Sequence, residues 1–201
     1  MRTIILFATI FLASLKISFA QHFSHGAGAG FFVEDADATD VKGSFTLTYS
    51  PRFNFAETEN TSLSIGIPLS AGFSGSYSAG YSSSYGYYED NDIGYMVNVP
   101  LLFSFNIGAG AVKGNQRRIG FFIGAGYAYN IGTAVYVFTD EYGYDWKNSV
   151  SESTTGPAGN FGIRIAVGSR KRHNIEIRTS YMKGINNYKP HIFGMNCLFN
   201  F

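Results

Sequence analysis

The sequence predicts an all-β protein, an eight-stranded antiparallel up-and-down transmembrane β-barrel, and three observations lead to this prediction. Apolar and polar residues alternate with a period of two along most of the chain, which is the pattern of β-strands. Aromatic residues reach 17% but charged residues only 14%, against about 25% charged residues in a typical soluble domain. The few charges within the alternating segments lie almost entirely on one of their two faces.

The N-terminal segment has the organisation of a secretory signal peptide. Arg2 supplies the positive start, residues 4–15 form an apolar core, and Ser18-Phe19-Ala20 is a small-x-small cleavage site. The apolar core is too short for a membrane-spanning helix, which needs about 20 residues. We therefore predict a cleaved signal peptide at residues 1–20 and one barrel domain at residues 21–201.

Eight segments of the remaining chain alternate, and each is roughly ten residues long, the length of a tilted strand that crosses a bilayer. The second segment is the clearest, because Phe45, Leu47 and Tyr49 alternate with Thr46 and Thr48. Odd-numbered residues form the apolar face in all eight segments, so we expect them to face lipid. In chain order the segments are Phe23–Val33, Phe45–Phe55, Leu63–Phe73, Ile93–Phe105, Ile119–Tyr129, Phe161–Val167, Ile175–Tyr181 and Phe193–Phe201.

The two faces of these segments differ in charge. The apolar face carries one charge, Lys183 at a strand end, whereas the other face carries Arg52, Arg164, Glu176 and Arg178 among mainly Gly, Ser, Thr, Asn and Ala. A soluble barrel needs a water-facing side dense in Lys and Glu, and neither face is of that kind. The composition of both faces is explained if the apolar face contacts lipid and the polar face lines the lumen. Closure of the sheet into a barrel also removes the strand edges that lipid does not tolerate.

The lumen of an eight-stranded barrel is just wide enough for side chains to fill it, so we predict a plugged barrel. Arg52, Arg164, Glu176 and Arg178 are expected to form a charge cluster inside it. Arg164 and Glu176 are equally distant in sequence from Arg170, so the hairpin between their strands places them side by side. Buried pairs of this kind are mostly structural, and a proton or ion pathway is the alternative interpretation.

The connections between segments alternate in kind. One set contains the two longest, about residues 74–92 and 132–155, and the other set is shorter. Long extracellular loops and short periplasmic turns are typical of outer-membrane barrels, so both termini are predicted in the periplasm. The Tyr/Ser/Gly-rich stretch 74–88 and the β-forming stretch 133–139 indicate strands that extend beyond the membrane, where a free edge could bind a surface protein partner by strand addition.

With a signal peptide, eight strands and a terminal aromatic residue, the chain resembles the small eight-stranded outer-membrane barrels of the outer-membrane protein X type and the transmembrane domain of the outer-membrane protein A type. The last strand of that family ends in an aromatic residue with a second one two positions before it. Phe201 and Phe199 match this pattern, and Met195 and Phe193 continue the same face. Asn196 stands where the family often has Gly.

The resemblance carries implications for assembly and location. It implies that the last strand is the signal recognised by the barrel-assembly machinery. It also implies residence in the outer membrane of a Gram-negative bacterium, with outer-membrane lipid and lipopolysaccharide as the surroundings of a porin-like barrel.

The predicted function is a non-enzymatic, structural or surface-interaction role at the cell surface. No catalytic, cofactor or metal site is predicted, and the net charge of +1 gives no indication of nucleic-acid binding. A small-solute, porin-like channel is the alternative. A lipid A-modifying hydrolase is the third interpretation, because His22-Phe23-Ser24 has the His-x-Ser spacing of the deacylase type of barrel, although no acid that would orient the histidine is apparent in the sequence.

Overall fold

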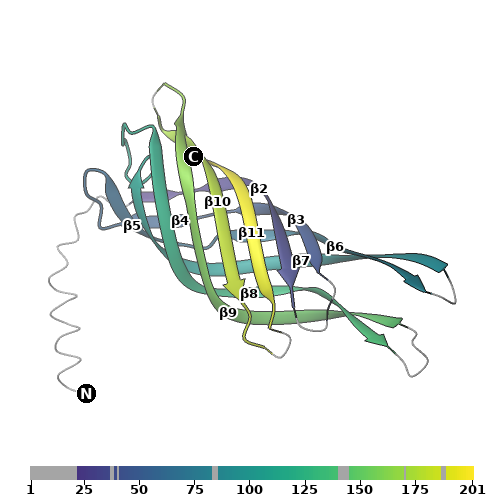
Figure 1. The fold of residues 1–201 in the computed structure, drawn as a ribbon. Coiled ribbons are helices and arrows are strands. Elements are labelled where there is room, and N and C mark those ends of the chain that lie inside the picture. Colours follow the sequence, from purple (N-terminus) through teal and green to yellow (C-terminus); the bar gives the residue numbers. More distant parts are fainter. Residues whose placement is uncertain are drawn as a thin grey trace, which may run out of the picture.

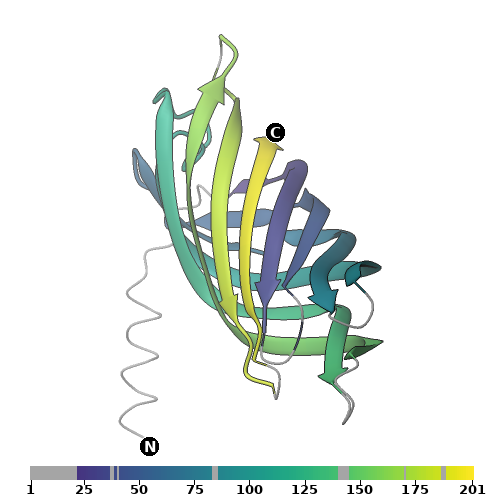
Figure 2. The same cartoon turned by 45° about the vertical axis from the view of Figure 1, so that its right-hand side comes forward.

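The computed structural model describes residues 22–36, 39, 41–82, 86–139, 145–169, 171–186 and 189–201, so the predicted signal peptide lies outside the described residues. Among the described residues, no helix is long and apolar enough to cross a membrane. The regular structure of this part of the chain is antiparallel β-sheet (Figures 1 and 2). Its strand segments are β1 (His22–Ser24), β2 (Gly26–Asp35), β3 (Lys42–Tyr49), β4 (Arg52–Phe55), β5 (Thr61–Gly66), β6 (Leu69–Ser82), β7 (Gly86–Gly108), β8 (Ile119–Thr139), β9 (Asp145–Val167), β10 (His173–Lys183) and β11 (His191–Asn200).

These segments make eight strands of a closed barrel, because β1 continues into β2, β3 into β4 and β5 into β6. Each barrel strand pairs antiparallel with the next along the chain, and β11 pairs with β2 to close the sheet. The predicted eight-stranded antiparallel up-and-down barrel is therefore confirmed. Closure leaves each central backbone group with a partner in the neighbouring strand, as a barrel in lipid requires.

The three interruptions lie on one line across the sheet, because the constant registers place Pro51 opposite His25 and opposite Ile67. Two of the gaps contain a proline, Pro51 between β3 and β4 and Pro68 between β5 and β6. Proline has no N–H to donate and locally breaks the ladder. The gap at His25 lies opposite Pro51, and beside it Gly26 and Ser50 still exchange two backbone hydrogen bonds. The sequence analysis treats these strands as continuous, and the structure corrects that expectation.

Strand residues keep one parity on each face of the barrel. Large apolar side chains on the outer face include Phe45, Leu47, Phe73, Ile123 and Phe161, all with odd numbers and all more than half exposed. Buried lumen side chains such as Thr46 and Asn106 have even numbers. The predicted alternation is observed in the barrel wall. Past the wall it is broken by Val150 of β9, which is even-numbered and exposed, and by Val135 of β8, which is odd-numbered and buried.

Two hairpins continue beyond the barrel wall, and the structure defines them by register. The β6–β7 pairing runs to Ser82↔Gly86, although β3 stops pairing with β6 at Ser76. The β8–β9 pairing runs to Thr139↔Asp145, although β7 pairs with β8 only from Met96↔Gly132. Both hairpins leave the barrel at the end opposite to the C-terminus (Figure 1). We call them the β6–β7 arm and the β8–β9 arm.

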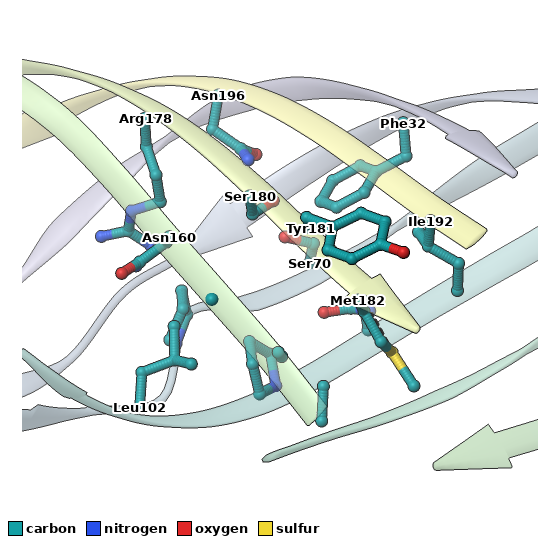
Figure 3. A pocket seen from close by; sticks show the side chains of 16 residues that line it. Phe32, Ser70, Leu102, Asn160, Arg178, Ser180, Tyr181, Met182, Ile192 and Asn196 are labelled. Atoms are coloured by element: carbon teal, nitrogen blue, oxygen red, sulfur yellow. Dashed lines mark hydrogen bonds between the residues drawn. The ribbon is translucent and has the colours of Figure 1, made fainter. Parts of the chain in front are cut away.

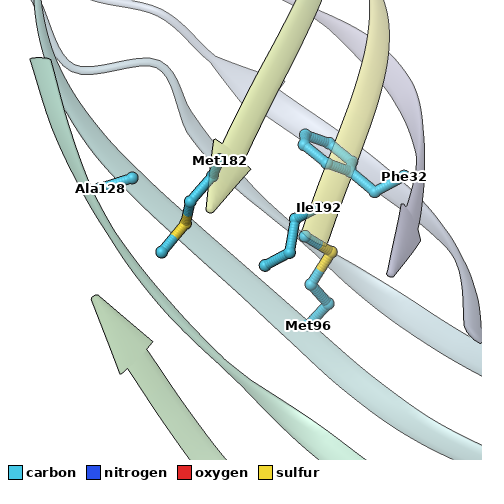
Figure 4. Packing of buried hydrophobic residues seen from close by; sticks show 5 residues of the cluster. All are labelled: Phe32, Met96, Ala128, Met182 and Ile192. Atoms are coloured by element: carbon cyan, nitrogen blue, oxygen red, sulfur yellow. The ribbon is translucent and has the colours of Figure 1, made fainter. Parts of the chain in front are cut away.

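The lumen half nearer the arms is filled by apolar side chains. Phe32, Met96, Ala128, Met182 and Ile192 form one buried cluster between strands on opposite sides of the barrel (Figure 4). The sequence analysis describes the lumen face as mainly small and polar, so this apolar plug is an addition to it. Glycine at position 194 leaves room for the ring of Phe32, because a Cβ built there would lie 2.4 Å from its Cε1 atom.

The turn after β7 depends on one glycine. Gly108 has φ +80° and ends β7, and a Cβ built there would lie 2.4 Å from the carbonyl oxygen of Ile119. Any other residue would be strained in this left-handed conformation and would also collide with the start of β8. The sequence thus places glycine where the chain turns tightly at the barrel end that carries the termini.

Candidate functional site

The four charged residues predicted for the lumen lie together in the half nearer the termini. Arg52 comes from β4, Arg164 from β9, and Glu176 and Arg178 from β10. Glu176 lies directly across from Arg164 in the β9–β10 register, as the equal spacing around the turn predicts. All four side chains are buried, and Glu176 has an exposed fraction of 0%.

The Glu176 carboxylate is the centre of the cluster. Its Oε2 accepts hydrogen bonds from Nε of Arg164 at 2.7 Å, from Nη1 of Arg52 at 2.9 Å and from Nδ2 of Asn200 at 3.1 Å. Its Oε1 accepts from Nη2 of Arg178. One carboxylate therefore serves three guanidinium groups, and the cluster has a net charge of +2.

Neutral side chains extend this network into the barrel wall. Arg164 Nη1 donates to Oδ1 of Asn106 at 2.9 Å, and Asn106 in turn donates to Oγ of Ser64. The ring of Phe122 lies under Arg164, with 4.4 Å between the ring centroid and the guanidinium carbon, and 5.7 Å from that of Arg178. An aromatic face attracts a cation, so Phe122 compensates part of the positive charge.

Sequence reasoning identifies the charged members of the network and misses the neutral ones. Asn106, Phe122 and Asn200 are even-numbered strand residues, so parity places them in the lumen. The contacts of Asn106 and Phe122 with arginines, and of Asn200 with Glu176, depend on the stagger between strands. Parity alone could have added them to the list of lumen residues, but not to the cluster.

Two of the small cavities between the described lumen side chains lie next to the charge cluster or the apolar plug. Each has a volume of about 20 Å³, and a cavity needs roughly 10–15 Å³ to hold one water molecule. The first lies between the apolar plug and Arg178 (Figure 3). The second is lined by the three arginines together with serine side chains and Asn160. Spaces of this size hold single small species.

A second ion pair lies in the lumen beyond the apolar plug, toward the arms. Lys42 Nζ lies 3.0 Å from Oε2 of Glu34 and donates to the backbone oxygen of Thr133. Both charged side chains are buried. The apolar plug therefore separates a balanced pair at one end from the unbalanced cluster at the other.

The His-x-Ser segment lies at the barrel end that carries the termini, and here the structure corrects the sequence analysis. His22 Nδ1 is within hydrogen-bonding distance of Oε1 of Glu57, so an acid does orient the histidine. Nδ2 of Asn54 lies 3.2 Å from Nε2 of His22 and 3.1 Å from Oγ of Ser24. The asparagine amide thus lies at the position where a base would contact the serine.

Glu57 escapes sequence analysis because it lies in the β4–β5 turn, 35 residues from His22. The register of β1 on β4 brings them together, and nothing in the local pattern fixes that register. Among the described residues, no group of three or more His, Cys, Asp and Glu side chains is arranged to hold a metal ion.

The predicted assembly-signal residues, Phe193, Met195, Phe199 and Phe201, all lie on the outer face and are about half exposed. Their strand, β11, pairs with β2 along its whole length. Phe201 also exchanges two backbone hydrogen bonds with His25, and their rings stack with centroids 5.9 Å apart. These contacts fix the position of the C-terminal residue at the seam between the first and last strands.

A closed antiparallel barrel with an apolar exterior and a charged interior defines the class of small transmembrane β-barrels. No protein-family model matches the chain, and no curated protein matches it significantly in sequence. Solved structures do match the fold. Ail, the attachment invasion locus protein of Yersinia pestis, has a TM-score of 0.51 and 10% identity over 90% of this chain and 99% of that one.

Neisserial surface protein A is similar with a TM-score of 0.53 and 12% identity, over 90% of this chain and 97% of its own. At such identities the likeness concerns the fold. The chain therefore has the fold of the small eight-stranded outer-membrane barrels that its sequence resembles.

Proposed function

We propose that this protein is a non-enzymatic outer-membrane barrel of a Gram-negative bacterium whose barrel anchors a surface-binding sheet. The observation that carries the proposal is the continuation of four strands past the barrel wall into the β6–β7 and β8–β9 arms. With the termini in the periplasm, both arms extend outside the cell. Lipopolysaccharide and outer-membrane lipid surround the barrel, and the barrel-assembly machinery inserts it through β11.

The backbone of the arms supports binding by strand addition. β9 pairs with β10 only as far as Ala158↔Met182, and in the part of the chain that the structure describes β8 is the one strand that pairs with residues 145–152. At Ser153 the edge is covered, because Nδ2 of Asn186 donates to its backbone oxygen at 3.0 Å. Likewise, residues 77–82 of β6 lie beyond its pairing with β3. An unpaired edge presents alternating N–H and C=O groups to which a partner strand can be added. A protein with an extended segment is therefore the proposed partner.

The neighbour Ail bears the name attachment invasion locus protein, and attachment at the surface is the role we propose here by analogy. The test uses shortened arms. Because Ser76 pairs with Asp92 and Ala134 with Val150, residues 77–91 or 135–149 can each be replaced by Asn-Gly, a two-residue hairpin turn. Cells that carry either variant should attach less well to serum-protein-coated surfaces than cells with the full chain.

The matched control keeps the arms and changes the opposite end of the barrel, for example by Lys171→Gln in the β9–β10 turn. That variant should attach like the unchanged protein. Equal attachment by full-length and shortened chains would contradict the proposed surface role. Protease added to intact cells should cleave near residues 81 and 144 and spare residues 170–172. Cleavage at that turn alone would reverse the proposed orientation.

The lumen supports an anchoring role over a conducting one. The apolar plug and the charge cluster occupy the interior, and the cavities between them hold single small species. We expect the refolded barrel to give no steady conductance in a planar bilayer. Ion-sized, steady currents would favour the small-solute channel instead.

The hydrolase alternative has one favourable contact, the hydrogen bond between Glu57 and His22. Asn54, however, donates to the atoms that a general base and a nucleophile would need to bring together. We therefore expect no change in lipid A mass in cells that express the protein. Loss of an acyl chain that disappears in Ser24→Ala would establish the hydrolase.

A further inference from the structure

The charge cluster has more donors than its own residues satisfy. Nε of Arg52 and both Nε and Nη1 of Arg178 are buried and have no hydrogen-bond partner among the described residues. Guanidinium groups stay protonated in proteins. Glu176 already accepts from four donors, so its carboxylate does not serve these three as well.

These donors belong to the residues that line the second cavity. Arg52, Arg164 and Arg178 all contribute to its wall. In Figure 3 the Arg178 side chain extends toward Asn160, and both residues line the two cavities. Three cationic groups thus surround a space of about 20 Å³ in which no carboxylate of the described chain takes part.

The neutral groups around this cavity are arranged to donate as well. Oγ of Ser50 accepts from Arg178 at 2.9 Å, and Oγ of Ser64 accepts from Asn106 at 2.9 Å. A hydroxyl that accepts one hydrogen bond keeps its own O–H to donate elsewhere. Asn160 also lines this cavity, and its Oδ1 is buried without a partner among the described residues. A half-turn of the amide, which exchanges its nearly indistinguishable O and N atoms, replaces that acceptor by a donor.

We propose that this cavity is a binding site for one small inorganic anion of the halide class, such as chloride. A single negative charge lowers the net charge of the cluster from +2 to +1 and accepts hydrogen bonds from the unpartnered guanidinium atoms. Water would fill the space but leave the charge uncompensated, and buried charge without compensation is unfavourable. The small volume of about 20 Å³ favours a monatomic anion over phosphate, sulfate or an organic acid.

A ligand that binds only the folded state stabilises that state in proportion to its occupancy. The barrel, refolded in lipid vesicles, should therefore unfold at a higher urea concentration in sodium chloride than in sodium methanesulfonate of the same ionic strength. At constant ionic strength, the midpoint should rise as chloride replaces methanesulfonate. Equal midpoints in the two salts would overturn the proposal, because general screening does not distinguish them.

A carboxylate introduced into the cavity distinguishes chloride binding at this site from other effects of the salt. Asn160→Asp places a carboxylate in the cavity with almost no change of shape, so its unfolding midpoint should no longer depend on chloride. Asn130→Asp is the matched control, because Asn130 is also buried in the lumen but lines neither cavity. It should be less stable yet keep the chloride dependence, and an unchanged dependence in Asn160→Asp would contradict the assignment.

If Asn160→Asp fails to refold, crystals of the unchanged protein grown in sodium bromide test directly whether an anion binds in the second cavity. The anomalous signal of bromide should appear in the second cavity within hydrogen-bonding distance of Arg178 Nη1. A cavity that contains only water under these conditions would overturn the proposal.

Discussion

The two halves of the lumen fill the same narrow interior with different chemistry. The half near the termini is filled by Arg52, Arg164, Glu176 and Arg178, whose contacts depend on direction and charge. The half near the arms is filled by the apolar plug, whose contacts depend on volume. Hydrogen bonds in the first half fix the stagger of strands that are distant in sequence. The second half accepts any set of apolar side chains that fills its volume.

This difference predicts unequal responses to substitution. Loss of the shared acceptor in the charged half leaves several buried cations without compensation. Loss of a methylene from the apolar plug removes only local contacts. The substitutions below test this contrast, and urea unfolding of the barrel in lipid vesicles measures each of them.

Glu176→Gln should have the largest effect. It removes the one carboxylate that three arginines share, and breaking a buried ion pair costs about 3–5 kcal/mol of unfolding free energy. Glu34→Gln is the matched control, because Glu34 is also a buried lumen carboxylate and pairs with Lys42 beyond the apolar plug. A loss of stability in Glu176→Gln no greater than in Glu34→Gln would show that the cluster does not depend on its central carboxylate.

An arginine placed on the outer face tests whether the lumen accommodates arginine better than lipid does. Ile65→Arg and Val99→Arg introduce a charge on the lipid-facing side, at a cost of roughly 2–4 kcal/mol near the bilayer midplane. Asn98→Ser changes a polar lumen residue without adding charge and should be tolerated. Equal tolerance of Ile65→Arg and Asn98→Ser would remove the evidence for a lipid-facing side.

In the apolar plug, Ile192→Val should reduce the free energy of unfolding by about 0.5–1.5 kcal/mol, because the deleted methyl group leaves a small cavity. Ile65→Val on the outer face should cost less, since lipid chains fill the space that the methyl group leaves. If the two substitutions cost the same, the plug does not pack as a close-fitting core.

Phe201→Ala should have the smallest effect on stability, within about 0.5 kcal/mol as for a surface substitution. Phe201 is 56% exposed, and its two hydrogen bonds with His25 involve only the backbone. Insertion by the assembly machinery in cells should nevertheless become slower, which pulse-labelling of the membrane fraction would measure. Deletion of Phe201 also removes its two backbone hydrogen bonds with His25. If unassisted refolding is slower for the deletion than for Phe201→Ala, the difference measures the contribution of these hydrogen bonds apart from that of the side chain.

The arrangement of the four charged lumen residues shows how far local reasoning reaches. Arg164 and Glu176 belong to one hairpin, so their equal spacing from the turn sufficed to pair them. Arg52 lies 124 residues from Glu176, and the contact depends on closure of the whole sheet. The same limit applies to Glu57 and His22, which meet only because β1 pairs with β4.

By itself, the sequence determined the eight strands, the face that each residue occupies and the absence of a water-compatible outer surface. These properties follow from a period of two and from where charges occur, which are local and need no knowledge of contacts. Tertiary structure alone decided the stagger between strands, the line of breaks across Pro51, the apolar plug and the surplus of donors around one cavity. The physical reason is that a strand fixes side-chain direction by its own geometry, whereas the neighbours of a lumen side chain are fixed only when the barrel closes.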